Sequence, residues 1–342
     1  MNENPYLPSP PANRPAQPWP DAGIPAGAVP VEHPRRPRVW PIPVVLLASF
    51  ACYITASIVA VVLAAFLVGG PDDAAMFGDG GKMEQITKSP LGLGIMLVFP
   101  QLAMAAPAVL AAFASPVPVA RRLGLVRGNW PIGLWLTAAM GTPLVGMISS
   151  AIVGALLGES ESLEEMSGVF RALGESGFLI PLALMVGITP GVCEELVFRG
   201  YVQTRLGAAW GAPLAIVCTS LVFAVFHMDL VHSAAVMALG VYLGWIAWAS
   251  GSVLAAMLAH FVNNFLSVLA VVLLPEAVAE GVPPAVDEVP LATAGVLGSV
   301  MLISAVCLLM TLLQSRRYRR NRLASGGEMQ ILSESGERSW PS

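Results

Sequence analysis

Long runs of apolar residues constrain the fold of this chain more than any other feature. Eight segments are dominated by apolar residues, and each approaches or exceeds the roughly 20 residues that a helix needs to cross a bilayer. They are residues 41–69, 91–115, 132–157, 178–206, 211–229, 233–250, 252–274 and 291–314. Of the 342 residues, 56% are hydrophobic and only 12% are charged, whereas soluble domains are about a quarter charged. The sequence therefore predicts an all-α polytopic membrane protein, a bundle of about eight transmembrane helices.

Polar tails flank the apolar region. Residues 1–39 are rich in proline and poor in large apolar side chains, so we predict a disordered cytoplasmic tail. Residues 40–315 form the predicted transmembrane helical domain. Residues 316–342 are predicted to be a cytoplasmic tail that is basic at first and then disordered. Between the third and fourth segments, residues 158–177 carry apolar side chains at helical spacing, which predicts an amphipathic helix on the outer surface.

The distribution of arginine predicts the orientation. Positive charge in short loops marks the cytoplasmic side of a membrane protein. If all eight segments cross and the N-terminus is inside, all but three of the 18 lysines and arginines lie on or near the cytoplasmic side. The exceptions are Lys82, Lys88 and Arg171. We therefore predict a multi-pass protein of the cell membrane with both termini cytoplasmic.

Three apolar segments carry charged, polar or aromatic side chains about one helical turn apart. The first segment has Glu194 and Glu195 followed by Arg199, the second has Phe223 followed by His227, and the third has His260 followed by Asn264. Charge at membrane depth is costly, so an acidic pair inside such a segment is a functional-site hypothesis by default. The four cysteines lie in apolar segments without a paired spacing, which is typical of core residues and not of a metal knuckle.

Helix geometry places the two carboxylates on different faces of the helix. Glu195 and Arg199 are four residues apart, so they share a helix face and are expected to pair. Glu194 lies about 100° round the helix from Glu195, and we expect it to face the bundle interior. Measured from the expected cytoplasmic ends at 1.5 Å per residue, Glu194 is ~18 Å deep, His227 ~24 Å and His260 ~12 Å. Asn264 is ~18 Å deep on the same scale. Pro190 and Gly191 are expected to kink the helix just before the carboxylates.

These residue types suit the hydrolysis of a peptide bond without a covalent intermediate. A buried glutamate and an imidazole that face one water form a general-base pair. A second imidazole and an amide can donate hydrogen bonds to the oxyanion that develops on a carbonyl. The structural interpretations are an ion pair for Glu195 and Arg199, interhelical hydrogen bonds for the histidines, and packing for Phe223. Asp229 and His232 are interpreted as solvated loop residues.

The three patterns together resemble the motifs of the CAAX protease and bacteriocin-processing family of intramembrane endopeptidases. Its Glu-Glu-x-x-x-Arg, Phe-x-x-x-His and His-x-x-x-Asn motifs are all present and in order, within a predicted protease core of about residues 130–275. The resemblance implies that Glu194 and His227 activate water and that His260 and Asn264 form the oxyanion hole. It implies a peptide or membrane-protein substrate, prenylated or not, beside the lipid bilayer, and no nucleic-acid partner.

Three alternatives stay open. Glu194, His227 and His260 are also a plausible zinc set with water as fourth ligand, although the usual His-Glu-x-x-His helix is absent. We favour catalysis without a metal or other cofactor, because Asn264 is more useful as an amide donor. A proton-coupled transporter would use the same residues as relay groups, but no internal repeat is visible. A non-catalytic membrane scaffold would not need Glu194 at membrane depth.

Overall fold

The structure is a computed structural model that describes residues 38–69, 80–158, 160–274 and 291–336. Every regular element in these ranges is a helix. The predicted N-terminal tail lies almost wholly outside the described residues, as do residues 70–79, 275–290 and 337–342. The expectation of an all-α membrane bundle is confirmed.

Seven helices in the described ranges are long and apolar enough to cross a membrane. Five of them are separate helices, namely α1 (Pro41–Gly69), α3 (Pro90–Phe113), α5 (Ile132–Leu157), α10 (Leu230–Ser250) and α11 (Val253–Leu273). The sixth lies within the continuous run Glu161–Trp210, and the seventh within α13 (Leu291–Gly336). The remaining predicted segment, 211–229, forms the shorter helix α9 (Ala212–Val225). Fourteen residues rise only ~21 Å, so α9 is shorter than a complete crossing.

The run Glu161–Trp210 consists of several parts. It begins with α6 (Glu161–Leu173), the amphipathic helix expected from residues 158–177, whose Phe170 and Leu173 are buried. A π-helical turn, η2 (Gly174–Phe178), contains Gly177 at φ 91°, where the chain bends into α7 (Leu179–Glu195). A second π-helical segment, η3 (Leu196–Gln203), leads into α8 (Thr204–Trp210). The positive φ explains a glycine at position 177, since other residues are strained there.

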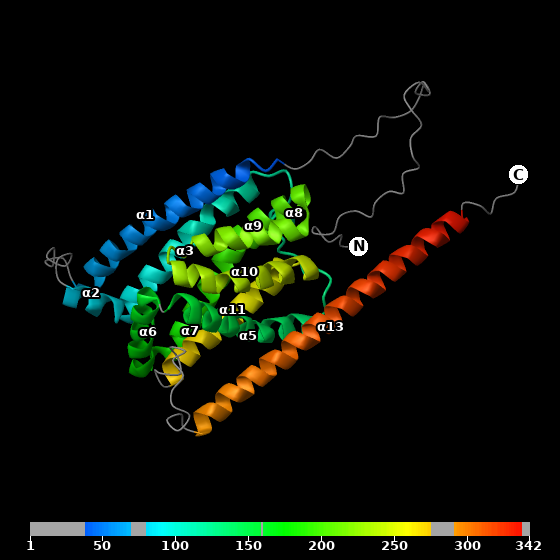
Figure 1. Cartoon of the computed structure of the whole chain (residues 1–342). Coiled ribbons are helices and arrows are strands. Elements are labelled where there is room, and N and C mark those ends of the chain that lie inside the picture. Colours follow the sequence, from blue (N-terminus) through cyan, green and yellow to red (C-terminus); the bar gives the residue numbers. More distant parts are fainter. Residues whose placement is uncertain (1–37, 70–79, 159, 275–290, 337–342) are drawn as a thin grey trace, which may run out of the picture.

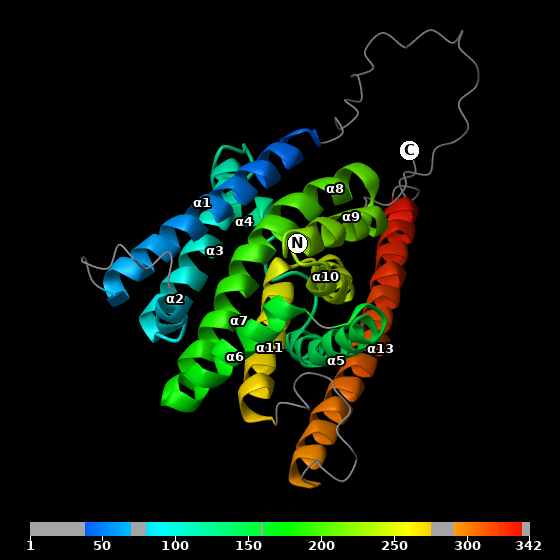
Figure 2. The same ribbon diagram turned by 60° about the vertical axis from the view of Figure 1, so that its left-hand side comes forward.

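Helices α7, α10 and α11 lie in the middle of the bundle. On one side α1 packs against α3, which contacts α7; on the other, α5 packs against α10, α11 and α13 (Figure 1; Figure 2). Two short helices, α2 (Gly80–Thr87) and α4 (Val119–Arg122), flank α3 in the chain. Beyond residue 314, where the last span was expected to end, α13 continues as a helix to Gly336.

Glycines on α7 bring α11 unusually close. A Cβ at Gly187 would lie 2.8 Å from Cδ2 of Phe261, and one at Gly191 would lie 3.2 Å from the Phe261 backbone nitrogen. Small residues one turn apart permit this kind of backbone approach in membranes. The helix continues through Pro190, and Gly191 is the point of close contact with α11. This contact holds the two helices that carry Glu194 and His260 together.

The corner between α9 and α10 corrects one interpretation. Asp229 is the N-cap of α10, and its Oδ1 accepts a hydrogen bond from the backbone N–H of His232 at 2.6 Å. Its Oδ2 accepts from the hydroxyls of Ser160 and Ser162 at 2.9 and 3.0 Å. His232 is therefore half-buried in the first turn of α10 and is not the solvated loop residue that the sequence suggested. The Asp229 interactions tie the start of α6 to this corner.

We expect Asp229→Ala to lower the thermal unfolding midpoint by roughly 2–4 °C at pH 7, because a capping acceptor is lost. The His232 N–H, and then the Ser160 hydroxyl, hold the pKa of the Asp229 carboxyl below its ordinary value of 3.8. A lowered folded-state pKa means that this stabilisation is complete above 3.8 and is lost as pH falls through the folded pKa. The wild type and the alanine variant should therefore converge in strongly acidic buffer. Asp229→Asn keeps a cap acceptor and should retain most of the midpoint at pH 7; a drop equal to that of alanine would contradict the capping role.

Candidate active site

A π-helical segment begins directly after the two carboxylates. Glu194 and Glu195 are the last residues of α7, and η3 starts at Leu196. π-Helical turns inside α-helices are rare and are often found at functional sites. Glu194 is 9% exposed, whereas Glu195 and Arg199 are completely buried. Nothing in the sequence pattern indicated this π-helical geometry.

Arg199 forms the expected ion pair with Glu195. Its Nη1 donates to Glu195 Oε1 at 2.7 Å, and its Nη2 donates to the carbonyl of Gly240 on α10 at 3.0 Å. The guanidinium carbon also lies 4.5 Å from the centroid of the Phe223 ring. One turn further along η3, Gln203 donates to the carbonyl of Gly244 at 2.8 Å. These interactions anchor η3 to α10.

Glu195 has a second partner that the sequence did not indicate. Nδ1 of His260 lies 2.9 Å from Glu195 Oε1, the same oxygen that accepts from Arg199. A carboxylate paired with arginine accepts hydrogen bonds, so Nδ1 of His260 carries the proton of this contact. The other ring nitrogen, Nε2, then faces Glu194, 3.8 Å from its Oε2. Arg199, Glu195 and His260 thus form one buried chain that ends at Glu194.

Gln101 is the site neighbour that sequence reasoning missed. It lies on α3, directly after Pro100, and its Nε2 donates to Glu194 Oε1 at 2.9 Å. The Gln101 amide oxygen is buried and has no hydrogen-bond partner in the described part of the chain. The only signal in the sequence is a lone amide within an otherwise apolar span. One oxygen of Glu194 is therefore held by α3, and the other faces His260.

His227 joins the site through Phe223. The Phe223 ring lies edge-on to both imidazoles, with centroid distances of 5.0 Å to His227 and 6.1 Å to His260. His227 lies in the turn after α9, and its Nδ1 is 3.0 Å from the Phe223 carbonyl oxygen. A carbonyl can only accept, so Nδ1 is the donor, and neutral His227 has its lone pair on Nε2. The His232 ring contacts the same imidazole at 4.5 Å.

Asn264 lies one turn after His260 on α11, as predicted from the spacing. Its Nδ2 donates to the backbone carbonyl of Val186 on α7 at 3.3 Å, and its Oδ1 accepts from Asn263 Nδ2 at 3.2 Å. Among the described residues, Glu194 has no direct hydrogen bond with either His227 or Asn264. The structure thus connects five of the predicted residues through pairwise contacts, namely Glu194, Glu195, Arg199, Phe223 and His260. His227 and Asn264 lie at the edge of this group.

The donor set offers little to a metal ion. Within the described ranges, no group of three or more histidine, cysteine or acidic side chains is arranged to hold one. Nε2 of His260 and the Glu194 carboxylate face each other, but in those ranges no third side chain of this kind joins them. The zinc alternative therefore lacks a third converging protein ligand in this geometry.

Residues 176–266 match the family model described as type II CAAX prenyl endopeptidase, Rce1-like. Over this segment the chain is similar to Rce1-like endopeptidases. The matched segment includes all three motifs, from Glu194 to Asn264, which confirms the resemblance to CAAX proteases noted from the sequence. The match supports an intramembrane protease at a general level. No curated protein and no solved structure matches the chain. The wider limits of the protease core, residues 130–275, stay a prediction.

Proposed function

We propose that the chain is an intramembrane endopeptidase that hydrolyses a peptide bond near the membrane, using water activated by Glu194 and His227. The observation that carries this proposal is the setting of the Glu194 carboxylate. It is buried, one of its oxygens accepts a hydrogen bond from Gln101, and the other faces His260. Its neighbour Glu195 already serves Arg199, so Glu194 is not needed as a counter-ion. A buried carboxylate held in place but not neutralised by an arginine is suited to accept a proton.

In this mechanism His227 assists Glu194 through the attacking water. The Nδ1 contact with the Phe223 carbonyl turns Nε2 into the available acceptor of neutral His227. Since Glu194 and His227 have no direct hydrogen bond, the water lies between them in the proposed complex. The water gives its proton to this pair as its oxygen attacks the carbonyl carbon, and the proton later reaches the leaving amine.

His260 and Asn264 supply the proposed oxyanion hole. Glu195 holds His260 by Nδ1, which leaves Nε2–H of the protonated ring to donate to the developing oxyanion. The Asn264 amide bonds to the Val186 carbonyl at the long distance of 3.3 Å, and it exchanges this partner for substrate. Such hydrogen-bond donors lower the activation barrier because they stabilise the negative charge that develops on the carbonyl oxygen in the transition state.

The experiment that tests this function is cleavage of a membrane-proximal peptide by the purified full-length chain in lipid vesicles. Wild type should cleave, and Glu194→Ala should not. Proton flux across the same vesicles without cleavage would favour the transporter alternative. A folded wild type without either activity across a panel of prenylated and unprenylated peptides would favour the scaffold.

Chelation should leave the activity of the wild type intact, because the mechanism draws on no metal. The measurement is the cleavage rate before and after incubation with a strong chelator, followed by metal analysis. In the zinc alternative, chelation abolishes cleavage, added Zn²⁺ restores it, and the protein holds about one equivalent per chain. That result would overturn the metal-free mechanism while leaving the peptidase function standing.

Gln101 is proposed to position Glu194, so its replacement should lower kcat for cleavage while KM changes little. Gln101→Leu removes the donor to Glu194 Oε1 and leaves that oxygen without its partner on α3. Gln101→Glu also lacks the amide donor and places a second carboxyl beside Glu194, so its kcat should fall as well. Leu102→Ala, on the exposed side of the same helix, is the matched control.

The other neighbours of Glu194, including His260, are unchanged in these variants. A general folding defect would lower the thermal unfolding midpoint together with the rate, whereas loss of positioning lowers kcat alone. An unchanged kcat in both Gln101 variants would contradict the positioning role.

A further inference from the structure

Two arginines from separate elements lie against one buried tyrosine. The guanidinium carbon of Arg122, at the end of α4, is 5.7 Å from the centroid of the Tyr201 ring, and that of Arg205, on α8, is 4.6 Å away. Tyr201 belongs to η3 and is only 1% exposed. The ring face attracts cations, and the two guanidinium groups are close enough to interact electrostatically.

These two cations have no acidic partner in the described part of the chain. Neither Arg122 nor Arg205 forms an ion pair there, and the Nε of each is buried without a hydrogen-bond partner. The one hydrogen bond of the Arg205 side chain goes to the Arg38 carbonyl, at 3.5 Å. Burial, and then the neighbouring Arg205 charge, lowers the pKa of the Arg122 guanidinium below its ordinary value. Two half-buried like charges repel each other, and an anion between them would offset that cost.

The backbone fixes the position of Arg122. The next residue, Leu123, is 1% exposed, and its carbonyl oxygen would lie 3.0 Å from a Cβ at Gly200 on η3. Leu123 and Tyr201 belong to the same apolar cluster as Leu206, the residue after Arg205. Both arginines therefore extend from a packed surface, which preorganises their donors.

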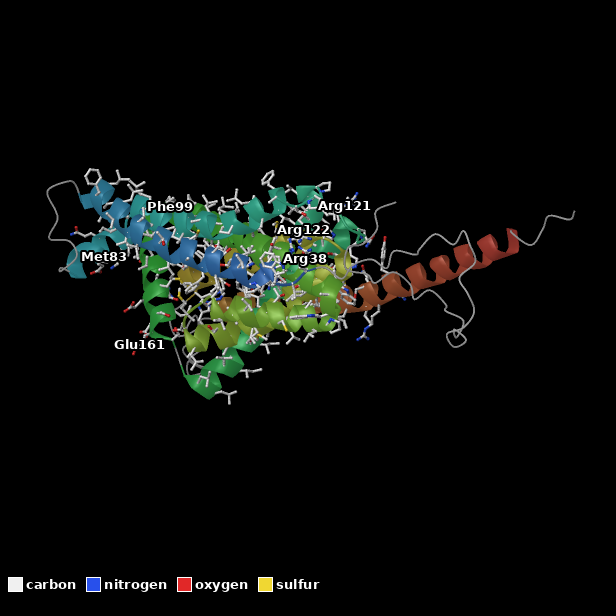
Figure 3. All side chains as sticks on the ribbon, turned by 90° about the horizontal axis from the view of Figure 1, so that it is seen from above. Arg38, Met83, Phe99, Arg121, Arg122 and Glu161 are labelled. Carbon is white, nitrogen blue, oxygen red and sulfur yellow. The ribbon has the colours of Figure 1, made fainter. Side chains whose placement is uncertain are left out.

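The arginine pair lies at one end of the bundle. In Figure 3, Arg121 and Arg122 are at the same end as Arg38, away from Met83 and Glu161. Arg38 precedes α1 and Arg122 follows α3, so this end is where two membrane-spanning helices begin and end. Two large apolar side chains near those helix ends, Trp40 and Phe113, are 63% and 68% exposed. Aromatic and basic residues together at a helix end are typical of the lipid headgroup region.

We propose that Arg122 and Arg205 form a binding site for the phosphate of an anionic phospholipid headgroup. The planar guanidinium groups match phosphate oxygens, and the two approach from different helices. A lipid, and not free phosphate, is the proposed occupant because the exposed apolar side chains at this helix end can contact its acyl chains. Basic pockets between transmembrane helices bind anionic headgroups in this way.

The test is a titration of the purified full-length chain in detergent with phosphatidylglycerol, followed by native mass spectrometry. Arg122→Gln/Arg205→Gln should weaken phosphatidylglycerol binding at least ~10-fold, since two charged donor groups are lost. The matched control, Arg121→Gln/Arg127→Gln, removes the same charge from exposed neighbours and should change the affinity by less than ~3-fold. Equal weakening by both pairs would overturn the site, because binding would then follow overall charge.

Two further measurements test the site, one with a lysine double variant and one with inorganic phosphate as a competitor. If the glutamine pair does not purify in folded form, Arg122→Lys/Arg205→Lys keeps the charges but loses the paired N–H donors, and its affinity should still fall. An unchanged affinity in the lysine pair would contradict bidentate phosphate recognition. Inorganic phosphate at millimolar concentration should not displace the lipid. Full displacement would overturn the lipid assignment and would show that the site binds free phosphate.

Discussion

Glu194→Gln should reduce turnover by ~10²–10⁴-fold, the usual contribution of a general base. Glutamine keeps the size of the side chain, and its oxygen can still accept the hydrogen bond from Gln101 Nε2. The substitution replaces Glu194 Oε2, the oxygen that faces His260 and can accept a proton, with an amide nitrogen. The measurement is kcat for peptide cleavage in vesicles. Substrate affinity should change little, because the loss concerns the transition state.

The control for this variant is Glu175→Gln, the same isosteric change at an exposed position in η2. It should cleave at the wild-type rate. Thermal unfolding midpoints of both variants should match that of wild type, which separates a catalytic loss from a folding defect. Full activity in Glu194→Gln would remove Glu194 from the proposed mechanism, with or without a metal.

The fold could be predicted because the membrane imposes a simple rule on sequence. Backbone polar groups must be satisfied within each span, so long apolar runs become helices. Residues 41–69 and 132–157 coincide almost residue for residue with α1 and α5. The rule fails at residues 211–229, because the segment includes His227 and Asp229, which form the turn into α10, and the helix ends at Val225.

The candidate site was predictable only within each helix. A spacing of four residues is enough to pair Glu195 with Arg199, and the structure confirms that pair. The contact between Glu195 and His260 joins residues 65 positions apart, and the bond from Gln101 to Glu194 joins residues 93 apart. Such contacts depend on which helices are neighbours, and one sequence carries no record of that arrangement. For the same reason, nothing marked His232 as a neighbour of His227.

Arg199→Met should lower the free energy of unfolding by about 3–5 kcal/mol, the largest stability effect expected for this site. Both side chains of the pair are 0% exposed, so solvent cannot replace the arginine. The variant leaves Glu195 as a buried charge and also removes the donor to the Gly240 carbonyl. The measurement is reversible unfolding in mixed micelles, with Arg121→Met as an exposed control that should change stability by less than ~0.5 kcal/mol. A loss below ~1 kcal/mol would mean that Glu195 and Arg199 behave as an exposed pair.

Two double variants separate stability from catalysis. Glu195→Leu/Arg199→Met removes both charges and should recover most of the lost stability, because an apolar pair costs less than an unpaired buried carboxylate. It also removes the acceptor for His260 Nδ1, so cleavage should stay low. Glu195→Gln/Arg199→Met likewise removes both charges but keeps an amide oxygen that can accept from Nδ1. This variant should be more active than the leucine double at similar stability. Equal activity in the two doubles would show that Glu195 acts only as the counter-ion of Arg199 and does not orient His260.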